Sequence, residues 1–176
     1  MCDKTTEFHE KVVRTLEELG TDHFQLPAKL CEHGDAYALR SEDTRWILVI
    51  RVANEASALA EASAALESED PPDRVILVTT KSTLSKRRPP EIAVFEEREL
   101  MYNAMRHADS PPMRKTTDEE RSALLSKLGI VDTNLLPAML PSDVAARYYG
   151  FGIGDVVKSL RMTSSGPTTY YRIVRF

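Results

Sequence analysis

Cysteine is scarce in this chain of 176 residues, and long apolar runs are missing. The two cysteines, Cys2 and Cys31, are too few and too far apart for a disulfide framework, which favours a reducing intracellular compartment. A membrane-spanning helix needs about 20 consecutive apolar residues, and no run approaches that length. We therefore expect a soluble protein that makes no membrane contact.

Patterns that indicate catalysis or metal binding are also missing. Cys31 and His33 are only two candidate zinc ligands, whereas a structural zinc site needs four. As a nucleophile and its base, they would also need a third group to orient the histidine. The glycines between Gly150 and Gly154 follow a helical pattern and precede a strand, the reverse of a dinucleotide-binding loop. We expect no catalytic residue, no metal and no cofactor.

The composition does predict a folded protein with an uneven charge distribution. Hydrophobic residues make up 42% of the chain, enough for a real core, and the net charge is −4. Residues 110–176 hold nine Lys or Arg against six Asp or Glu, whereas residues 1–109 hold fourteen against twenty-one. An acidic chain is a poor general binder of polyanions, so any nucleic-acid contact must be local.

The first part of the chain has the pattern of an α/β domain. The predicted elements are a helix over residues 6–19 ended by Gly20, strands over 36–39 and 46–52, a helix over 54–68 and a strand over 74–79. The strand over 46–52 is apolar except for Arg51, as in strands buried on both faces. Strand, helix and strand in this order predict a right-handed crossover and a parallel pair.

A proline-containing linker separates this part from the rest of the chain. Before it we expect a short strand over 92–95 and a helix over 97–106, and the linker itself covers 107–115. We place the domain boundary between an N-terminal domain, 1–110, and a C-terminal domain, 111–176. The second domain opens on a capping box, in which Thr117 and Glu120 satisfy each other's free N–H groups.

The last third of the chain predicts a small α+β module. The expected elements are a helix over 144–149 capped by Ser142 and Asp143 and ended by Gly150, a strand over 156–160, a turn over 164–167 and a return strand over 168–176. Tyr170 and Tyr171 are neighbours on the return strand, so their rings face opposite ways. One of them needs a cover, which a partner protein would supply.

The segment from Leu136 onward carries the motif LPxxLxSDxxAxYYGxxxGDVVKxxR, followed by YYRIV. This motif resembles the C-terminal module of the fifth common subunit of eukaryotic RNA polymerases and of its archaeal homologue. The stretches VILVTTKSTLSK and VFEERELMYNAMRH are similar, in their order, to the first domain of the eukaryotic type, which the archaeal homologue lacks. The resemblance therefore implies the two-domain form, found in nuclear polymerases and in those of some large DNA viruses.

The resemblance implies a non-catalytic subunit of a multisubunit DNA-directed RNA polymerase. Its C-terminal module would dock on the largest subunit, beside other polymerase subunits, and its N-terminal domain, with a restriction-endonuclease-like fold, would form part of a jaw near downstream duplex DNA. The location implied is the nucleus, or a cytoplasmic viral factory or virion if the polymerase is viral. The interface residues that we assign are Leu136, Pro137, Asp143, Tyr148, Tyr149, Lys158, Arg161, Tyr170, Tyr171 and Arg172.

A basic, hydroxyl-rich loop follows the predicted strand over 74–79. The residues that we assign to non-specific DNA contact are Lys81, Thr83, Ser85, Lys86, Arg87 and Arg88. Cations and hydroxyls of this kind bind phosphates without reading bases. The alternative for this loop is a solvated basic surface.

Two other functions compete with a polymerase subunit. The first is a stand-alone nuclease-like DNA-processing protein, which needs acidic metal ligands and a Glu-x-Lys on a core strand. Residues 47–52 carry only Arg51 as a charged residue, and residues 75–79 carry none, so such ligands are missing where they are expected. The second is a free-standing adaptor that binds a partner other than a polymerase.

Overall fold

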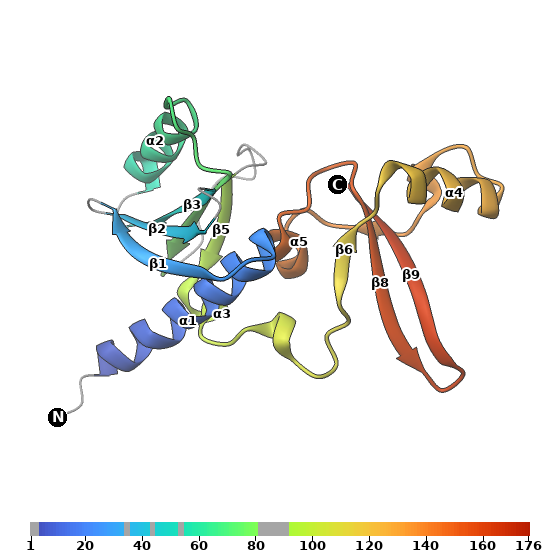
Figure 1. The fold of residues 1–176 in the computed structure, drawn as a ribbon, viewed down its shortest axis with the longest axis horizontal. Helices are drawn as coiled ribbons and strands as arrows, with labels where there is room; N and C mark the ends of the chain where they lie inside the picture. Colours follow the sequence, from blue (N-terminus) through green and yellow to red (C-terminus); the bar gives the residue numbers. More distant parts are fainter. Residues whose placement is uncertain (1–3, 34–35, 43–44, 53–54, 81–91) are drawn as a thin grey trace. The chain divides into compact units, whose positions relative to one another are not determined.

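The computed structural model describes residues 4–33, 36–42, 45–52, 55–80 and 92–176. The chain divides into two compact units, unit 1 over Met1–Asn103 and unit 2 over Ala104–Phe176 (Figure 1). The domain boundary that we place between residues 110 and 111 from the sequence differs from this division, between residues 103 and 104, and stays a prediction.

Unit 1 is an α/β fold built on a mixed five-stranded sheet. Its elements are α1 (Lys4–Phe24), β1 (Ala28–His33), β2 (Ala36–Ser41), β3 (Trp46–Arg51), α2 (Glu55–Leu66), β4 (Arg74–Thr79), β5 (Ile92–Glu96) and α3 (Glu97–Leu100). The strands lie in the order β1-β2-β3-β4-β5, the first three antiparallel and the last three parallel. The strands predicted over 36–39 and 46–52 form an antiparallel pair, and the predicted parallel pair across α2 is confirmed.

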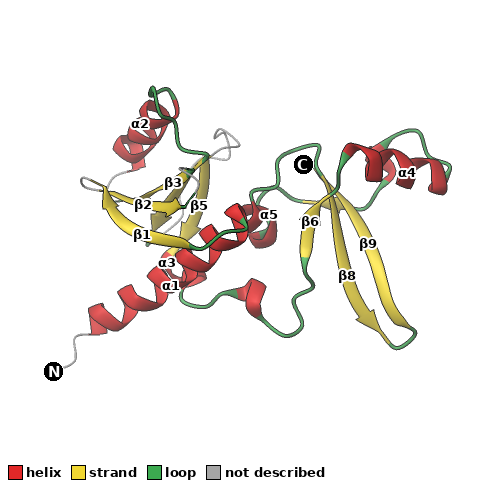
Figure 2. Cartoon of the chain, in the orientation of Figure 1, coloured by secondary structure: helices red, strands yellow, loops and turns green. Residues whose placement is uncertain are grey.

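Helices cover both faces of this sheet (Figure 2). On one face, Ala58 and Ala62 of α2 pack with Leu48 of β3 and Leu77 of β4. Alternate strand residues such as Ile47 point to the opposite face, where α1 lies against β1 and β2. The central strands are therefore buried on both sides, as their continuous apolar sequences predict.

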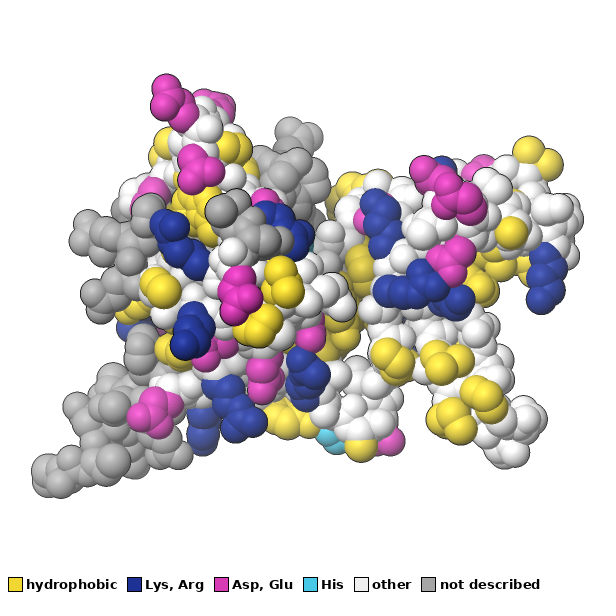
Figure 3. All heavy atoms as spheres, viewed as in Figure 1, with side chains coloured by type: hydrophobic (Ala, Val, Ile, Leu, Met, Phe, Trp, Pro, Cys, Tyr) yellow, Lys and Arg dark blue, Asp and Glu magenta, His cyan; other side chains and the backbone are white. Residues whose placement is uncertain are grey.

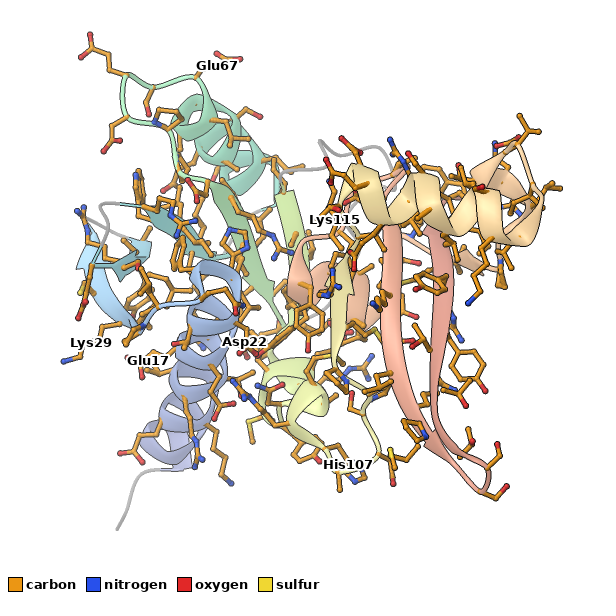
Figure 4. All side chains as sticks on the ribbon, turned by 45° about the vertical axis from the view of Figure 1, so that its right-hand side comes forward. Glu17, Asp22, Lys29, Glu67, His107 and Lys115 are labelled. Atoms are coloured by element: carbon orange, nitrogen blue, oxygen red, sulfur yellow. The ribbon has the colours of Figure 1, made fainter. Side chains whose placement is uncertain are left out.

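The prediction that Gly20 ends the first helix is wrong, because α1 continues to Phe24. A Cβ atom on Gly20 would lie 3.0 Å from Ala28 Cβ and 3.4 Å from Leu39 Cδ1. The glycine therefore permits the helix to approach the β1–β2 hairpin closely. Next to it, Glu17 Oε1 accepts the backbone N–H of Leu30 at 3.2 Å, which ties α1 to β1 (Figure 4).

Unit 2 is a small α+β fold around a four-stranded sheet. Its elements are the 3₁₀ helices η1 (Ala104–Arg106) and η2 (Thr133–Leu135), the strands β6 (Met113–Lys115), β7 (Ala138–Met139), β8 (Val156–Thr163) and β9 (Gly166–Val174), and the helices α4 (Asp118–Leu128) and α5 (Val144–Tyr149). The strand order is β6-β8-β9-β7, with β8 antiparallel to both β6 and β9 and with β7 parallel to β9.

Two predictions around the linker are corrected by the structure. The helix expected over 97–106 is only the single turn α3, followed by the 3₁₀ turn η1. Between them Asn103 is buried and donates from Nδ2 to Glu18 Oε2 at 2.7 Å, which fixes the chain against α1. The linker expected over 107–115 ends in β6, which forms because it pairs with β8, a strand far along the chain.

The helix ends of unit 2 follow the sequence closely. Thr117 and Glu120 form the predicted capping box at the start of α4. Asp143 caps α5 by accepting the N–H of Ala145 at 2.8 Å, whereas Ser142 contributes its backbone carbonyl, not its hydroxyl, to Arg147. Gly150 ends α5 at φ 73°, as predicted. The turn predicted over 164–167 is shorter, because β9 already begins at Gly166, with φ 112°.

Two small cores lie on opposite faces of the unit 2 sheet. On the α5 face the cluster consists of Met139, Ala145, Ala146, Val157 and Val174. On the α4 face it consists of Leu124, Leu136, Val156 and Ile173. Val156 and Val157 are adjacent, as are Ile173 and Val174, so each strand supplies both cores by alternation. Both cores use one end of the β8–β9 hairpin, and the other end projects beyond them (Figure 1).

Candidate subunit interface

Exposed apolar side chains line one face of the projecting end of the hairpin. Met162 lies opposite Pro167, and Leu160 opposite Thr169, so these side chains share a face. Leu160 is 46% exposed and Met162 78% exposed, and Pro167 is exposed as well. Figure 3 shows hydrophobic side chains gathered over this hairpin. We call Leu160, Met162 and Pro167 the hairpin apolar patch.

The opposite face of the hairpin presents an aromatic ring with a cation. Tyr170 is 44% exposed, and the guanidinium carbon of Arg161 lies 5.6 Å from its ring centroid. At that distance the arginine and the ring attract each other through the ring quadrupole. Together with the apolar patch, this arrangement gives both faces of the hairpin side chains that are common in protein interfaces.

The hairpin and the residues that follow it are positively charged. Residues 156–176 contain Lys158, Arg161, Arg172 and Arg175 and no Asp or Glu. The preceding acid, Asp155, is engaged by Lys115 of β6, whose Nζ lies 2.6 Å from its Oδ1 (Figure 4 labels Lys115). A partner surface that complements this hairpin therefore carries acidic groups.

One carboxylate joins three elements at the base of the hairpin. Glu120, at the start of α4, accepts hydrogen bonds from Arg114 of β6 at 2.5 and 2.7 Å, and Lys158 of β8 lies 3.5 Å away. It also accepts the backbone N–H of Thr117 at 3.2 Å. The Arg114 hydrogen bond is the largest of the causes that lower the pKa of Glu120 from 4.5 to about 2.

Replacing the Glu120 carboxylate with the neutral amide of glutamine, which has nearly the same shape, should make the stability of unit 2 less sensitive to acid. We expect Glu120→Gln to unfold at lower urea than wild type at pH 7, because glutamine keeps the capping bond but not the ion pairs. The folded-state pKa is depressed, so the contribution of the carboxylate is fully present above pH 4.5 and is lost as the pH falls toward about 2.

The measurement is the urea midpoint of wild type and Glu120→Gln between pH 7 and pH 2, followed by circular dichroism. The two midpoints should converge across the window from pH 4.5 to about 2. Because the group is partly exposed, 1 M salt should narrow the gap at pH 7. A gap that stays constant over the whole pH range would contradict a role for the charge.

The structure separates the ten predicted interface residues into two groups. Leu136 and Tyr148 are 6% and 4% exposed and belong to the interior of the unit. Tyr149 stacks on Phe151 with 5.4 Å between ring centroids, and Asp143 caps α5. These residues shape the module. Pro137 is exposed, and its carbonyl accepts the N–H of Ile173 at 2.9 Å.

The remaining predicted residues come together on the hairpin. Lys158, Arg161, Tyr170, Tyr171 and Arg172 all lie on β8 or β9. Tyr170 is the exposed member of the tyrosine pair, whereas Tyr171 is half-buried against the α4-side core. The expectation that one of the two rings lacks a cover within its own unit thus corresponds to Tyr170.

Sequence reasoning missed the most exposed apolar residues of unit 2. They are Leu128, Val131, Leu135, Leu140, Ile153, Leu160, Met162 and Phe176. Val131, three residues beyond the end of α4 at Leu128, is 96% exposed. The signal for Leu160 and Met162 was available, because extending the predicted strand from 160 to 163 places both on one face by alternation. No local pattern distinguishes the others from core leucines.

The six residues assigned to DNA contact lie outside the described residues. Lys81, Thr83, Ser85, Lys86, Arg87 and Arg88 fall between the end of β4 at Thr79 and the start of β5 at Ile92. Their assignment stays a prediction from the sequence.

The described residues contain no nuclease-type metal site. β3 and β4 carry no acidic side chain, and across the described ranges no group of three or more His, Cys, Asp or Glu side chains is placed to hold a metal ion. In the same part of the chain, no helix is both long and apolar enough to cross a membrane. Cys31, on β1, is a free and exposed thiol.

Comparison with known proteins identifies the class of unit 2. Residues 102–174 match the family model described as RNA polymerase Rpb5, C-terminal domain. The matched segment covers nearly all of unit 2, including α4, α5 and the β8–β9 hairpin. The fold and the motif therefore define a module of this class.

Individual relatives extend the comparison. The chain is 34% identical over 74 residues to DNA-directed RNA polymerase subunit Rpo5 of Pyrococcus horikoshii, which is 42% of this chain and 89% of that protein. It is 37% identical over 81 residues to DNA-directed RNA polymerases I, II, and III subunit RPABC1 of Caenorhabditis elegans, and 38% identical over 80 residues to DNA-directed RNA polymerase subunit 5-like protein 1 of Arabidopsis thaliana. Each of these two matches covers 46% of this chain. The chain belongs to the family of RNA polymerase subunit 5.

The extent of the match differs between the two kinds of relative. The matched part spans 38% of the length of the Caenorhabditis elegans protein and 37% of the Arabidopsis thaliana protein, but 89% of the archaeal one. The chain therefore matches well under half the length of these two eukaryotic relatives, and nearly the whole length of the archaeal one.

Proposed function

We propose that this chain is a non-catalytic subunit of a multisubunit DNA-directed RNA polymerase. The observation that carries the proposal is the match of this chain to a protein named as an RNA polymerase subunit, over 89% of that protein's length. The exposed hairpin of unit 2, which carries apolar and aromatic side chains and no acidic residue, supports a role in binding a partner subunit. The polymerase is nuclear, or viral and assembled in a cytoplasmic factory or virion.

Unit 2 is the part that docks on the largest polymerase subunit. Its exposed hairpin residues, Tyr170, Leu160 and Met162, supply the apolar contact area, and Arg161 and Arg172 supply the charge. Buried aromatic and arginine anchors contribute much of the affinity in protein interfaces. The remaining assigned interface residues, including Leu136 and Tyr148, hold the backbone that presents these anchors.

Unit 1 forms part of a jaw beside downstream duplex DNA. Its mixed sheet with helices on both faces is compatible with the restriction-endonuclease-like architecture that the resemblance implies. The basic loop after β4 supplies the phosphate contacts, through Lys81, Lys86, Arg87 and Arg88 with the hydroxyls of Thr83 and Ser85. These contacts are not sequence-specific.

Copurification tests this function. The tagged chain is isolated from its native cell or infected host, and its companions are identified by mass spectrometry. We expect the largest polymerase subunit among them. Purified chain incubated with DNA and Mg²⁺ is the companion assay, because cleavage without any polymerase subunit would favour the nuclease alternative over the proposal.

Removing the cations of the basic loop should weaken the hold of the polymerase on DNA without affecting assembly. Each lost phosphate contact lowers the slope of log affinity against log salt by about 0.9. The triple variant Lys86→Ala, Arg87→Ala and Arg88→Ala therefore changes the slope by up to about 2.7 in the reconstituted polymerase. The measurement is the salt dependence of elongation-complex stability.

A matched control removes the same charge elsewhere in unit 1. Lys11 and Arg14 of α1 and Lys29 of β1 are exposed, and changing all three to alanine should leave the slope unchanged. An unaltered slope in the loop variant would mean that the loop is a solvated basic surface that does not contact DNA. Loss of subunit incorporation instead would mean that the loop faces protein.

A further inference from the structure

The β9 strand has an open edge over most of its length. On one side it pairs with β8 from Gly166 to Ile173. On the other side its partner β7 reaches only Ile173 and Val174. Within the described part of the chain, residues 166–172 of β9 therefore have no neighbouring strand on the β7 side.

The backbone groups on this edge are identified by their alternation. Ile173 and Arg175 donate their N–H groups to Pro137 and Met139, at 2.9 and 3.0 Å, on the β7 side, whereas Val174 donates to Asp155, at 2.9 Å, on the β8 side. Alternate residues of an antiparallel strand point their N–H and C=O groups the same way. Thr169 and Tyr171 therefore direct their N–H and C=O groups outward along the open edge.

This edge has little of the protection that soluble proteins give to exposed strands. Such protection consists of inward-pointing charges, bulges, covering loops or prolines along the edge. Here Pro167 stands only at the start of β9, and the outward N–H groups of Thr169 and Tyr171 remain available. An edge of this kind accepts an additional strand, and backbone hydrogen bonds then supply part of the affinity.

The charge around the edge selects the occupant. A second copy of this chain, paired edge to edge, would bring two acid-free segments together, each with Lys158, Arg161 and Arg172. Like charges opposite one another in a sheet are destabilising. A segment with acidic residues opposite Arg172 would instead place unlike charges next to each other, which is stabilising. Apolar residues of that segment opposite Thr169 would extend the hairpin apolar patch, because Thr169 lies opposite Leu160 on the same face.

We propose that an extended segment of a neighbouring polymerase subunit, with alternating acidic and apolar residues, adds to the unit 2 sheet along the open edge of β9. The inference rests on the proposed function and names the way in which the partner binds. The added strand occupies the sheet position next to β9 that β7 fills at Ile173 and Val174. Its backbone pairs with Thr169 and Tyr171.

Hydrogen exchange gives a direct test with unaltered protein. Exchange is compared between the isolated full chain and its complex with the largest polymerase subunit, by mass spectrometry with fragmentation that resolves single amides. We expect exchange at Thr169 and Tyr171 to slow by roughly tenfold or more in the complex. The amides of Tyr170 and Arg172, which face β8, should change much less. Slowing that lacks this alternation would overturn strand addition in favour of docking through side chains.

A proline variant removes one outward donor. Thr169→Pro deletes an N–H that faces out of the sheet, a position where an edge strand tolerates proline. We expect its affinity for the largest subunit to fall by roughly tenfold, while Thr169→Ala, which keeps the N–H, binds like wild type. Thermal unfolding of the free variants checks that unit 2 still folds. Equal binding by a folded Thr169→Pro would overturn the inference.

The charge preference is tested separately. Arg172→Glu should lower the affinity for the largest subunit, and added salt should then relieve a repulsion at residue 172 instead of screening an attraction. Arg172→Lys should keep the affinity and the salt dependence of wild type. Failure of the proposed function and failure of this inference give different results. If wild type does not associate with the largest subunit at all, the proposed function fails. If wild type and a folded Thr169→Pro associate equally well, only strand addition fails. Dimerisation of the isolated chain with slowed exchange at Thr169 and Tyr171 would instead identify a second copy as the occupant and overturn the choice of partner.

Discussion

Deleting residues 171–176 is expected to abolish the cooperative unfolding of unit 2. The deletion removes Ile173 and Val174, which are buried in the α4-side and the α5-side core respectively. It also removes the whole β7 pairing and half-buried Tyr171. Burial of each large apolar side chain contributes about 1.5–3 kcal/mol, and total stabilities are about 5–15 kcal/mol. A small unit cannot absorb that loss.

The two units can be followed separately in this experiment. The chain has one tryptophan, Trp46, on β3 of unit 1. Its fluorescence should keep a cooperative urea transition in the truncated protein, while the part of the circular dichroism transition that belongs to unit 2 disappears. Deleting only Phe176, which is exposed, is the control and should leave both transitions in place. A truncated chain that retains both would refute the role of β9 in both cores.

Introducing a large side chain at Gly20 is expected to destabilise unit 1 strongly. Even a Cβ atom there meets Ala28 Cβ at 3.0 Å, so the further atoms of a leucine have no space between α1 and the β1–β2 hairpin. Overpacking of this kind costs about 1–3 kcal/mol and sometimes more. We expect Gly20→Leu to lower the urea midpoint of the Trp46 transition and to leave unit 2 unaffected.

A leucine on the exposed side of the same helix is the matched control. Lys11 is exposed on α1, and Lys11→Leu should stay within about 0.5 kcal/mol of wild type. The comparison separates helix propensity from steric conflict, because leucine is a good helix former at both positions. If Gly20→Leu were as stable as Lys11→Leu, helix α1 would not approach the hairpin as closely as described.

The features that the sequence predicts well are local ones. The capping box at Thr117 and Glu120, the cap at Asp143 and the stop at Gly150 depend on residues within one helical turn, and all of them are present. The parallel pair of β3 and β4 also follows from order alone, because a helical connection rules out a hairpin. Short-range chemistry and chain order were therefore sufficient for these elements.

The features that the sequence missed depend on distant contacts. Gly20 looks like a helix stop until Ala28 and Leu39 are placed against it. β6 looks like a linker until β8 supplies its hydrogen-bonding partners. Within the segment that carries the motif, the sequence did not distinguish Leu136, which is buried, from Leu160, which is exposed. Burial is a property of the assembled unit, so a motif alone cannot assign it.

The position of β9 between β8 and β7 has a consequence for the order of folding events. β8 and β9 are joined by a short turn, so their hairpin closes locally, on the microsecond scale typical of hairpins. β7 must come from much earlier in the chain to pair in parallel with Ile173 and Val174, and such non-local pairing is slower. Changes near Gly166 then act mainly on the rate of folding, and changes in β7 mainly on the rate of unfolding.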